Sequence, residues 1–283
     1  MKVPAAVLGY ARAQRDAIVT TEPAVRHGDA AAVHDMRVAT RRLRGTLRTF
    51  RPLWSAERRR PIRAELKWLA GQLGPVRDGE VLRDRLTDAV RAEPAELVVG
   101  PVAARIRQRL TTDVDAGRRR LLDALDAPRY LALLAALDKL LDATPPRVPR
   151  RRLIKRAATA VRRAETDLDA AGTDTELHES RKEFKRARYA AEAVAPAVGP
   201  PATRLAKRLS AVQDILGTHQ DAVVAEALLR DYGMRAQRDD ENAFTYGLLS
   251  ARQRAAGERA LRDLAAARHA AAKPKLRRWL RRH

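Results

Sequence analysis

The chain has 283 residues, of which 45% are hydrophobic and 33% are charged, so it can bury a core in one large or two medium-sized domains. It contains no cysteine, which excludes disulfides and thiol chemistry, and 57 lysine and arginine residues against 35 aspartate and glutamate residues give a net charge of +22. Such a charge favours anionic ligands: nucleic acid, anionic lipid or a phosphate polymer. Composition alone leaves an arginine-rich, merely solvated surface equally open.

An all-α fold is predicted, because helix-forming alanine, leucine, arginine and glutamate dominate and no run of alternating β-branched residues is present. We expect the first helix at the N-terminus. Arg12 and Arg15 lie where a signal peptide would need small residues for cleavage. No apolar run reaches the ~18 residues of a membrane span. The sequence therefore predicts no transmembrane segment and a cytoplasmic location.

Proline and glycine divide the rest of the chain into helical segments. The strongest break is residues 144–149, where three prolines fall close to the midpoint. It predicts a first helical half at 1–143, a linker at 144–149, a second half at 150–272 and a basic, partly disordered tail at 273–283. The other expected breaks are Glu22-Pro23, Arg51-Pro52, Gly74-Pro75, Glu93-Pro94, Ala127-Pro128, Ala171-Gly172, Ala195 through Pro201, Gly217 and Gly233.

The two halves contain an internal repeat. The segment VHDMRVATRRLRGTLRTF from Val33 corresponds to LHESRKEFKRARYAAEAV from Leu177 at an offset of 144 residues. A second block, LGPVRDGEV from Leu73, corresponds to LGTHQDAVV from Leu216 at an offset of 143 residues. Two blocks in the same order at a nearly constant offset predict two homologous helical bundles related by a pseudo-twofold axis.

Helix starts are signalled shortly before the first block of each repeat. Asp29 is a good N-cap, and Thr173 with Glu176 forms a capping-box pattern. His34 and His178 therefore lie in the early turns of two corresponding helices, where the helix dipole favours anions.

Basic residues are concentrated on one face of each of these two helices. At 100° per residue, the basic stripe of the first helix covers an arc of about 80° and lies opposite the apolar stripe that should face the core. The basic stripe comprises His34, Arg37, Arg41, Arg44 and Arg48, and the apolar stripe comprises Met36, Leu43, Leu47 and Phe50. The second helix repeats the stripe with His178, Arg181, Lys185 and Arg188, but has Glu192 in the fifth position. Like charges this close destabilise a helix unless an anion neutralises them.

Phosphate is the ligand that these side chains suit, because arginine offers forked donors and lysine a point charge. Further cationic candidates lie downstream: Arg63, Lys67, Arg77, Arg204, Lys207, Arg208 and His219. We expect Asp78 and Asp221 to orient a neighbouring basic residue or to cap a turn.

The motifs VHDMRVATRRLR and LHESRKEFKRARY, each followed by an LG…D block, resemble the CHAD domain, the conserved histidine α-helical domain. The resemblance covers roughly residues 5 to 270 and implies two bundles around a basic central cleft that binds inorganic polyphosphate, with targeting to polyphosphate or polyester granules. Glu192 and the pair His219-Gln220 depart from the repeat. The predicted ligand-binding set is His34, Arg37, Arg41, Arg42, Arg44, Arg48, Lys67, Arg77, His178, Arg181, Lys182, Lys185, Arg186, Arg188, Lys207 and Arg208.

An enzyme is not expected. The sequence has no Walker-type glycine loop and no HExxH motif. The neighbours His34-Asp35 and His178-Glu179 point about 100° apart on a helix and do not converge on a metal. No cofactor and no metal are therefore predicted.

Two other binding functions stay open. A chain of this charge binds nucleic acid weakly through phosphates, although the basic stripes lack the interleaved aromatic residues that stack on bases. The tail KPKLRRWLRRH could lie on an anionic membrane surface with Trp279 and Leu280 at the interface.

Overall fold

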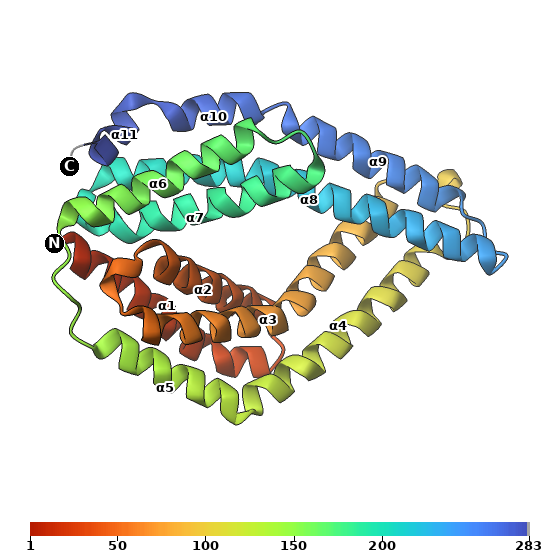
Figure 1. Cartoon of the computed structure of the whole chain (residues 1–283). Helices are drawn as coiled ribbons and strands as arrows, with labels where there is room; N and C mark the ends of the chain where they lie inside the picture. The colour runs from red at the N-terminus through yellow and green to blue at the C-terminus, as the bar shows by residue number, and fades with distance from the viewer. Residues whose placement is uncertain (282–283) are drawn as a thin grey trace.

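In the computed structural model, which describes residues 1–281, every regular element is helical (Figure 1). The predicted all-α class is confirmed. The α-helices in chain order are α1 (Val3–Arg26), α2 (Ala30–Thr49), α3 (Ala56–Arg91), α4 (Val102–Asp126), α5 (Pro128–Asp142), α6 (Arg150–Asp169), α7 (Asp174–Val198), α8 (Pro200–Arg238), α9 (Phe244–Leu261), α10 (Leu264–Ala272) and α11 (Pro274–Arg281). Short 3-10 helices, η1 (Arg51–Leu53) and η2 (Ala95–Leu97), flank α3.

Two hydrophobic cores hold these helices together. The larger core joins α1, α2, α5, α6, α7, α10 and α11 with the N-terminal parts of α3 and α8 and the C-terminal part of α4. The smaller core joins the C-terminal parts of α3 and α8 with α4 and α9, and Leu86, Ile106 and Leu229 at its centre are fully buried. Figure 1 shows both termini on the side of the larger core, with α3, α4, α8 and α9 extending away from it. The long helices α3 and α8 therefore connect the two cores.

The predicted caps of α2 and α7 are confirmed. The Asp29 carboxylate accepts backbone N–H bonds from Ala31 at 2.7 Å and Ala32 at 3.2 Å. At the start of α7, Thr173 and Glu176 form the reciprocal capping box. These caps fix where the two helices begin, and so fix the register of His34 and His178 on them.

The break expected at Gly74-Pro75 is wrong, because α3 continues through Pro75, as it does through Pro61. The break expected between Ala195 and Pro201 is confirmed: α7 includes Pro196 but ends at Val198, before Gly199, whose φ is +88°. A proline inside a helix removes one backbone hydrogen bond and bends the helix without having to end it when tertiary packing holds both sides. Figure 1 shows such a change of direction within α3.

Gly217 and Gly233 also lie within a continuous helix, α8, and do not end it. Both occur where another side chain approaches the helix closely. A Cβ atom at position 217 would lie 3.2 Å from the guanidinium of Arg181, and one at position 233 would lie 3.1 Å from the Cβ of Tyr246. These glycines therefore provide space for packing, which their sequence context does not reveal.

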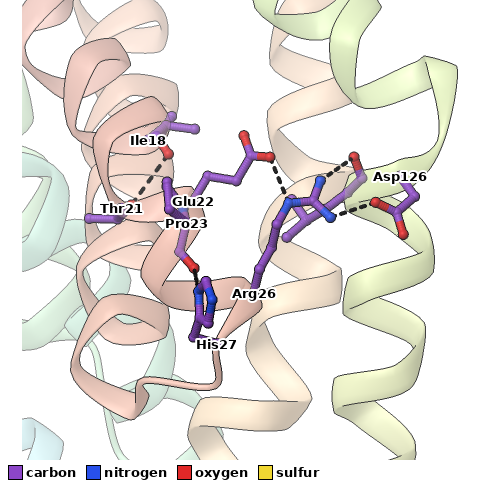
Figure 2. Close-up of polar contacts among 8 residues, drawn as sticks. Ile18, Thr21, Glu22, Pro23, Arg26, His27 and Asp126 are labelled. Carbon is purple, nitrogen blue, oxygen red and sulfur yellow. Dashed lines mark hydrogen bonds and ion pairs between the residues drawn. The ribbon is translucent and has the colours of Figure 1, made fainter.

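The C-terminal end of α1 is tied to α4, and the helix continues one turn beyond the break expected at Pro23 (Figure 2). Arg26 donates to the Glu22 carboxylate at 2.9 Å, to Asp126 at 2.5 Å and to the carbonyl of Leu125 at 3.1 Å. The ring of His27 lies 2.7 Å from the carbonyl of Pro23. Side chains therefore satisfy groups that the helix end leaves free.

The expectation of a disordered, membrane-seeking tail is wrong for the part of the tail that the structure describes. Residues 274–281 form α11, and Leu276, Trp279 and Leu280 are buried against the larger core. Arg282 and His283 lie outside the described residues. No helix within residues 1–281 has both the length and the apolar character needed to cross a membrane. The apolar residues assigned to a lipid surface instead complete the protein core.

We expect Arg277→Ala to lower the free energy of unfolding by about 1–2 kcal/mol, because a half-buried charged hydrogen-bond network is lost. Arg277 donates to the carbonyl of Ala271 at 2.8 Å and pairs with Glu165 on α6. Urea denaturation measures the change. The matched control is Arg278→Ala on the exposed face of α11, and equal losses in the two variants would contradict the docking role of Arg277.

Candidate functional site: a cationic pocket between four helices

A pocket of about 700 Å³ lies among α2, α3, α7 and α8, at the place where α3 and α8 leave the larger core. Eight lysine and arginine residues and two histidines line it, against two aspartates. Its charged and histidine lining residues are His34, Arg37, Arg41, Arg44, Lys67, Arg77, Asp78, Arg85, His178, Arg181, Lys182 and Asp221. The four helices therefore bring together positive charge from both halves of the sequence.

Helix α2 presents its basic face to the pocket because its opposite face is anchored. Met36, Leu43 and Leu47 are completely buried in the larger core, as the sequence predicts. Side chains on the other side of the helix, including Arg37 and Arg41, must then face away from that core. Apolar packing of one face of α2 therefore fixes the direction of the cations on the opposite face, so that each cation does not need its own polar contact to orient it.

Aspartates on the two long helices hold the deepest arginines. Arg37 on α2 donates to the Asp78 carboxylate on α3 at 3.0 Å, which confirms the expected orienting role of Asp78. Burial lowers the pKa of Arg181, whereas the charge of Asp221 on α8 acts in the opposite direction. Gly217, one turn before Asp221, leaves the space that the Arg181 guanidinium occupies. Both arginines stay charged at pH 7, because the guanidinium group does not lose its proton in proteins.

The two histidines lie in the same pocket, one from each of α2 and α7. Burial is the largest cause that lowers the pKa of His34, and Arg77 and Arg37 lower it further. Burial also lowers the pKa of His178, with Lys182 and Arg181 adding to the effect. Both rings are therefore neutral at pH 7, and each can still donate one N–H to an anion.

Lys185, predicted to contact the ligand directly, instead lies buried beside the pocket. Its side chain is 9% exposed. Burial, and then the charges of Arg41, Arg181 and Arg37, lower its pKa to about 6, against the opposing effect of Asp221. The repeat pairs Lys185 with Arg41, but the packing of the two halves is unequal at this position: Arg41 lines the pocket and Lys185 does not.

Arg42 and Arg188 are also absent from the pocket, because Glu192 draws them together between α1, α2 and α7. The Glu192 carboxylate lies 3.3 Å from Arg42 and 3.4 Å from Arg188, and accepts a hydrogen bond from the hydroxyl of Tyr10 at 2.6 Å. Both guanidinium groups also lie over the ring of Tyr189, at 5.8 and 5.0 Å from its centroid. This cluster is a structural link between the halves.

The remaining predicted residues lie elsewhere. Arg48 and Arg186 line a different, smaller pocket, and Lys207 and Arg208 are exposed on α8 outside both pockets. His219, a candidate from its place after the LG motif, is buried, with Nε2 2.9 Å from Asp174 Oδ1 and Nδ1 3.3 Å from the Gly257 carbonyl oxygen. It fastens α8 to the start of α7 and to α9.

Sequence reasoning missed Arg85 and Gln220 in the lining. Arg85 donates to Gln253 on α9 at 2.8 Å, and it follows Asp78 by two helical turns. The spacing of positions 78, 81, 82 and 85 is a helical face. This face lies on the part of α3 that follows Pro75, which the assumed break at Gly74-Pro75 treated as separate from the preceding helix.

The pocket is chemically suited to binding an extended polyanion. Its described lining contains no aromatic side chain, and no group of three or more histidine, aspartate or glutamate residues within residues 1–281 could hold a metal ion. Its polar groups are almost all donors, so a ligand with many acceptor oxygens matches them best.

Comparison with known proteins agrees with this arrangement. Residues 9–230 match the CHAD domain. The chain belongs to the CHAD domain family. This family is associated with polyphosphate binding in general. The suspected family resemblance, drawn from the paired histidine motifs, is confirmed.

Two solved structures share the fold over nearly the whole chain. PptA from Streptomyces chartreusis superposes with a TM-score of 0.81 at 24% identity, covering 95% of this chain and 100% of that one. The crystal structure of the CHAD domain from the plant Ricinus communis gives a TM-score of 0.71 at 25% identity, covering 96% and 92% of the two chains.

A mycobacterial relative extends beyond the CHAD region. The uncharacterized protein MT2285 of Mycobacterium tuberculosis is 34% identical over 267 residues, which cover 90% of this chain. The chain spans 50% of the length of this curated relative.

Proposed function

We propose that this CHAD protein binds inorganic polyphosphate without catalysing a reaction, in the pocket between α2, α3, α7 and α8. The observation that carries the proposal is the charge of that pocket: eight lysine and arginine side chains from four helices against two aspartates. A polymer with a negative charge on every unit can neutralise many of them at once, and each contact is charge-assisted. Family membership supports the same ligand.

Nucleic acid is the alternative ligand, and the composition of the pocket argues against it. Proteins that hold single strands use aromatic side chains as stacking platforms for bases. The described pocket lining offers none. Polyphosphate has no bases to accommodate, so a pocket rich in cations and without aromatic side chains in its described lining suits it better. Weak, non-specific binding of nucleic acid is still expected from a net charge of +22.

A binding role is also more consistent with the pocket than phosphate chemistry. Enzymes that transfer or hydrolyse phosphoryl groups hold Mg²⁺ with clustered carboxylates. In this pocket, Asp78 is occupied by Arg37, and Asp221 is the only other carboxylate of the described lining. Both aspartates therefore serve the cations rather than a metal.

The organisation of the binding site follows from the sequence repeat. We propose that the halves at 1–143 and 150–272 are related by a pseudo-twofold axis, and that the pocket is the basic central cleft between them. In support, α2 and α7 contribute His34 with Arg37 and His178 with Arg181 to one pocket. A cytoplasmic protein of this kind would be recruited to polyphosphate or polyester granules.

We expect long-chain polyphosphate to displace double-stranded DNA from the protein at physiological salt and equal phosphate concentration. The measurement is fluorescence anisotropy of a labelled DNA duplex during titration with polyphosphate. Salt must be held constant, because electrostatic binding to either polymer weakens as salt increases.

The reciprocal titration distinguishes the two functions. If DNA displaces polyphosphate with equal or greater efficiency, the pocket has no preference for the inorganic polymer and the proposed function fails. A variant with Lys207 and Arg208 replaced by alanine tests the exposed face of α8. If this variant still prefers polyphosphate, the preference does not depend on that face.

A further inference from the structure

A second cationic pocket, of about 250 Å³, lies where the end of α2 and η1 meet α6 and α7. It is separate from the central pocket and shares no lining residue with it. Five arginines from these four elements line it: Arg48, Arg51, Arg156, Arg163 and Arg186. The hydroxyl-bearing side chain of Thr159 also lines this pocket.

The carboxylates near this second pocket neutralise only two of its arginines. Glu183 pairs with Arg186 and lies 3.6 Å from Arg163, and Asp167 lies 3.5 Å from Arg163. Arg48, Arg51 and Arg156 have no carboxylate within ion-pair distance among residues 1–281. The pocket therefore carries an excess of positive charge.

Repulsion between like charges makes this excess charge unfavourable in the free protein. Arg48 and Arg51 are exposed, whereas Arg156 is half-buried and lies beside the pocket's other cations. Burial lowers the pKa of Arg156, and its charged neighbours Arg51 and Arg152 lower it further. An external anion bound among these arginines would relieve the repulsion.

The repeat provides an internal control. Arg48 in the first half corresponds to Glu192 in the second, at the same offset of 144 residues that relates Arg12 to Arg156. Glu192 pairs with Arg42 and Arg188 and so neutralises the arginine cluster around it. At the corresponding position beside the second pocket, Arg48 has a positive charge where Glu192 has a negative one. At this position one cluster therefore contains a carboxylate, and the other contains a further arginine without an ion-pair partner among residues 1–281.

A line of cations connects the two pockets. Arg44 lines the central pocket, and Arg48 lies one helical turn further along α2, about 6 Å away. The pKa of Arg44 is lowered by burial and by Arg41, Arg63 and Arg48, and the pKa of Arg63 by burial and by Arg48. These four arginines are thus close enough to interact, and together they lead from one pocket to the other.

We propose that the pocket bounded by Arg48, Arg156 and Arg186 is a second phosphate-binding site, occupied by a distant part of the same polyphosphate chain that fills the central pocket. The chemistry is that of a phosphate oxyanion, which accepts forked hydrogen bonds from arginines. The site rests on the proposed function, because the central pocket supplies the first attachment. Attachment at two points raises the effective concentration of the second phosphate segment.

The test compares Arg48→Glu with a matched control, Arg119→Glu, on tripolyphosphate and on long-chain polyphosphate. Arg48 is exposed, and Glu192 already occupies the corresponding position of α7, so the helix tolerates the change. Arg119 is exposed on α4 and lines neither pocket, and its replacement changes the net charge equally. We expect Arg48→Glu to weaken long-chain binding at least ~10-fold more than the control does, with equal affinity for tripolyphosphate.

The alternative outcomes are distinct. Equal effects of the two variants on long-chain binding would overturn the second site. A loss of tripolyphosphate affinity equal to the loss for the long chain would place Arg48 in the central site and also overturn the inference. Retained binding of tripolyphosphate to the second pocket when Arg37 and Arg181 are both alanine would identify an independent small phosphate as the occupant and overturn the shared-chain proposal. Failure of the wild-type protein to bind either probe would instead reject the proposed function.

Discussion

Replacing Arg37 and Arg181 together by alanine is expected to weaken polyphosphate binding by about 3–6 kcal/mol, or roughly 10²- to 10⁴-fold. The two arginines come from α2 and α7, lie in one pocket, and are near enough for the charge of Arg181 to lower the pKa of Arg37. Removing them deletes two charge-assisted contacts. It also leaves Asp78 without its partner at 3.0 Å, so that its negative charge faces the ligand.

The double variant separates a site from diffuse attraction. The matched control is Arg119→Ala with Arg120→Ala, two exposed arginines of α4 that have the same total charge. Isothermal titration calorimetry at constant salt measures both. A defined site predicts little change in the control, since exposed charges more than a Debye length from the ligand are screened. Equal losses in the two double variants would show that only net charge matters.

The helix faces around the pocket could be predicted because local signals determine them. Asp29 and Thr173 mark the starts of α2 and α7, and the apolar period then requires the basic stripe to face away from the core. The buried Met36 and Leu43 show that this reasoning holds for α2. Nine of the sixteen predicted residues line the central pocket. Among them, His34 with His178 and Arg37 with Arg181 are the repeat pairs of which both members line it.

The extent of α3 and α8 could not be predicted from local signals. Pro75 and Gly217 are helix-breaking residues by intrinsic preference, but each lies where packing from both sides outweighs that preference. The result is two helices of 36 and 39 residues that reach from one core to the other. Arg85 lines the pocket from the part of α3 that follows Pro75, which the assumed break separated from the first part of the helix.

The repeat misleads where the two halves have diverged in charge. Lys185 and Arg41, or Glu192 and Arg48, occupy corresponding positions, and an offset alone assigns them equal roles. The structure shows that Glu192 sequesters Arg42 and Arg188, and that Lys185 is buried whereas Arg41 is not. Such differences depend on contacts between the halves in the folded protein. An alignment of one half with the other carries no information about these contacts.

Lys185 lies in a buried position that disfavours its charged form. We therefore expect it to lower the free energy of unfolding while the pocket is empty. Its pKa is about 6 in the folded protein and near 10.4 in an unfolded chain. Between these two values the unfolded chain binds a proton that the folded chain does not, so the free energy of unfolding increases with pH across this window. At pH 7, deprotonating the lysine on folding is therefore a net cost, which bound phosphate would offset by favouring the charged form.

Lys185→Met should remove that cost and raise the free energy of unfolding at pH 7 by roughly 1–3 kcal/mol, whereas Lys155→Met on the exposed face of α6 should change it little. The same variant should bind polyphosphate more weakly, because the wild-type amine takes up a proton when the polymer binds and adds a positive charge beside Arg41, Arg37 and Arg181.

Calorimetry at pH 8 in buffers of different ionisation enthalpy measures this proton uptake directly. His34 and His178, whose pKa values are lowered by burial, remain neutral at that pH before binding and can contribute to uptake only as the pH falls. A variant that gains stability, loses proton uptake at pH 8 and loses affinity together would show that the protein retains an unfavourable buried lysine for its ligand. A gain in stability with unchanged uptake and affinity would show that Lys185 is only a packing defect.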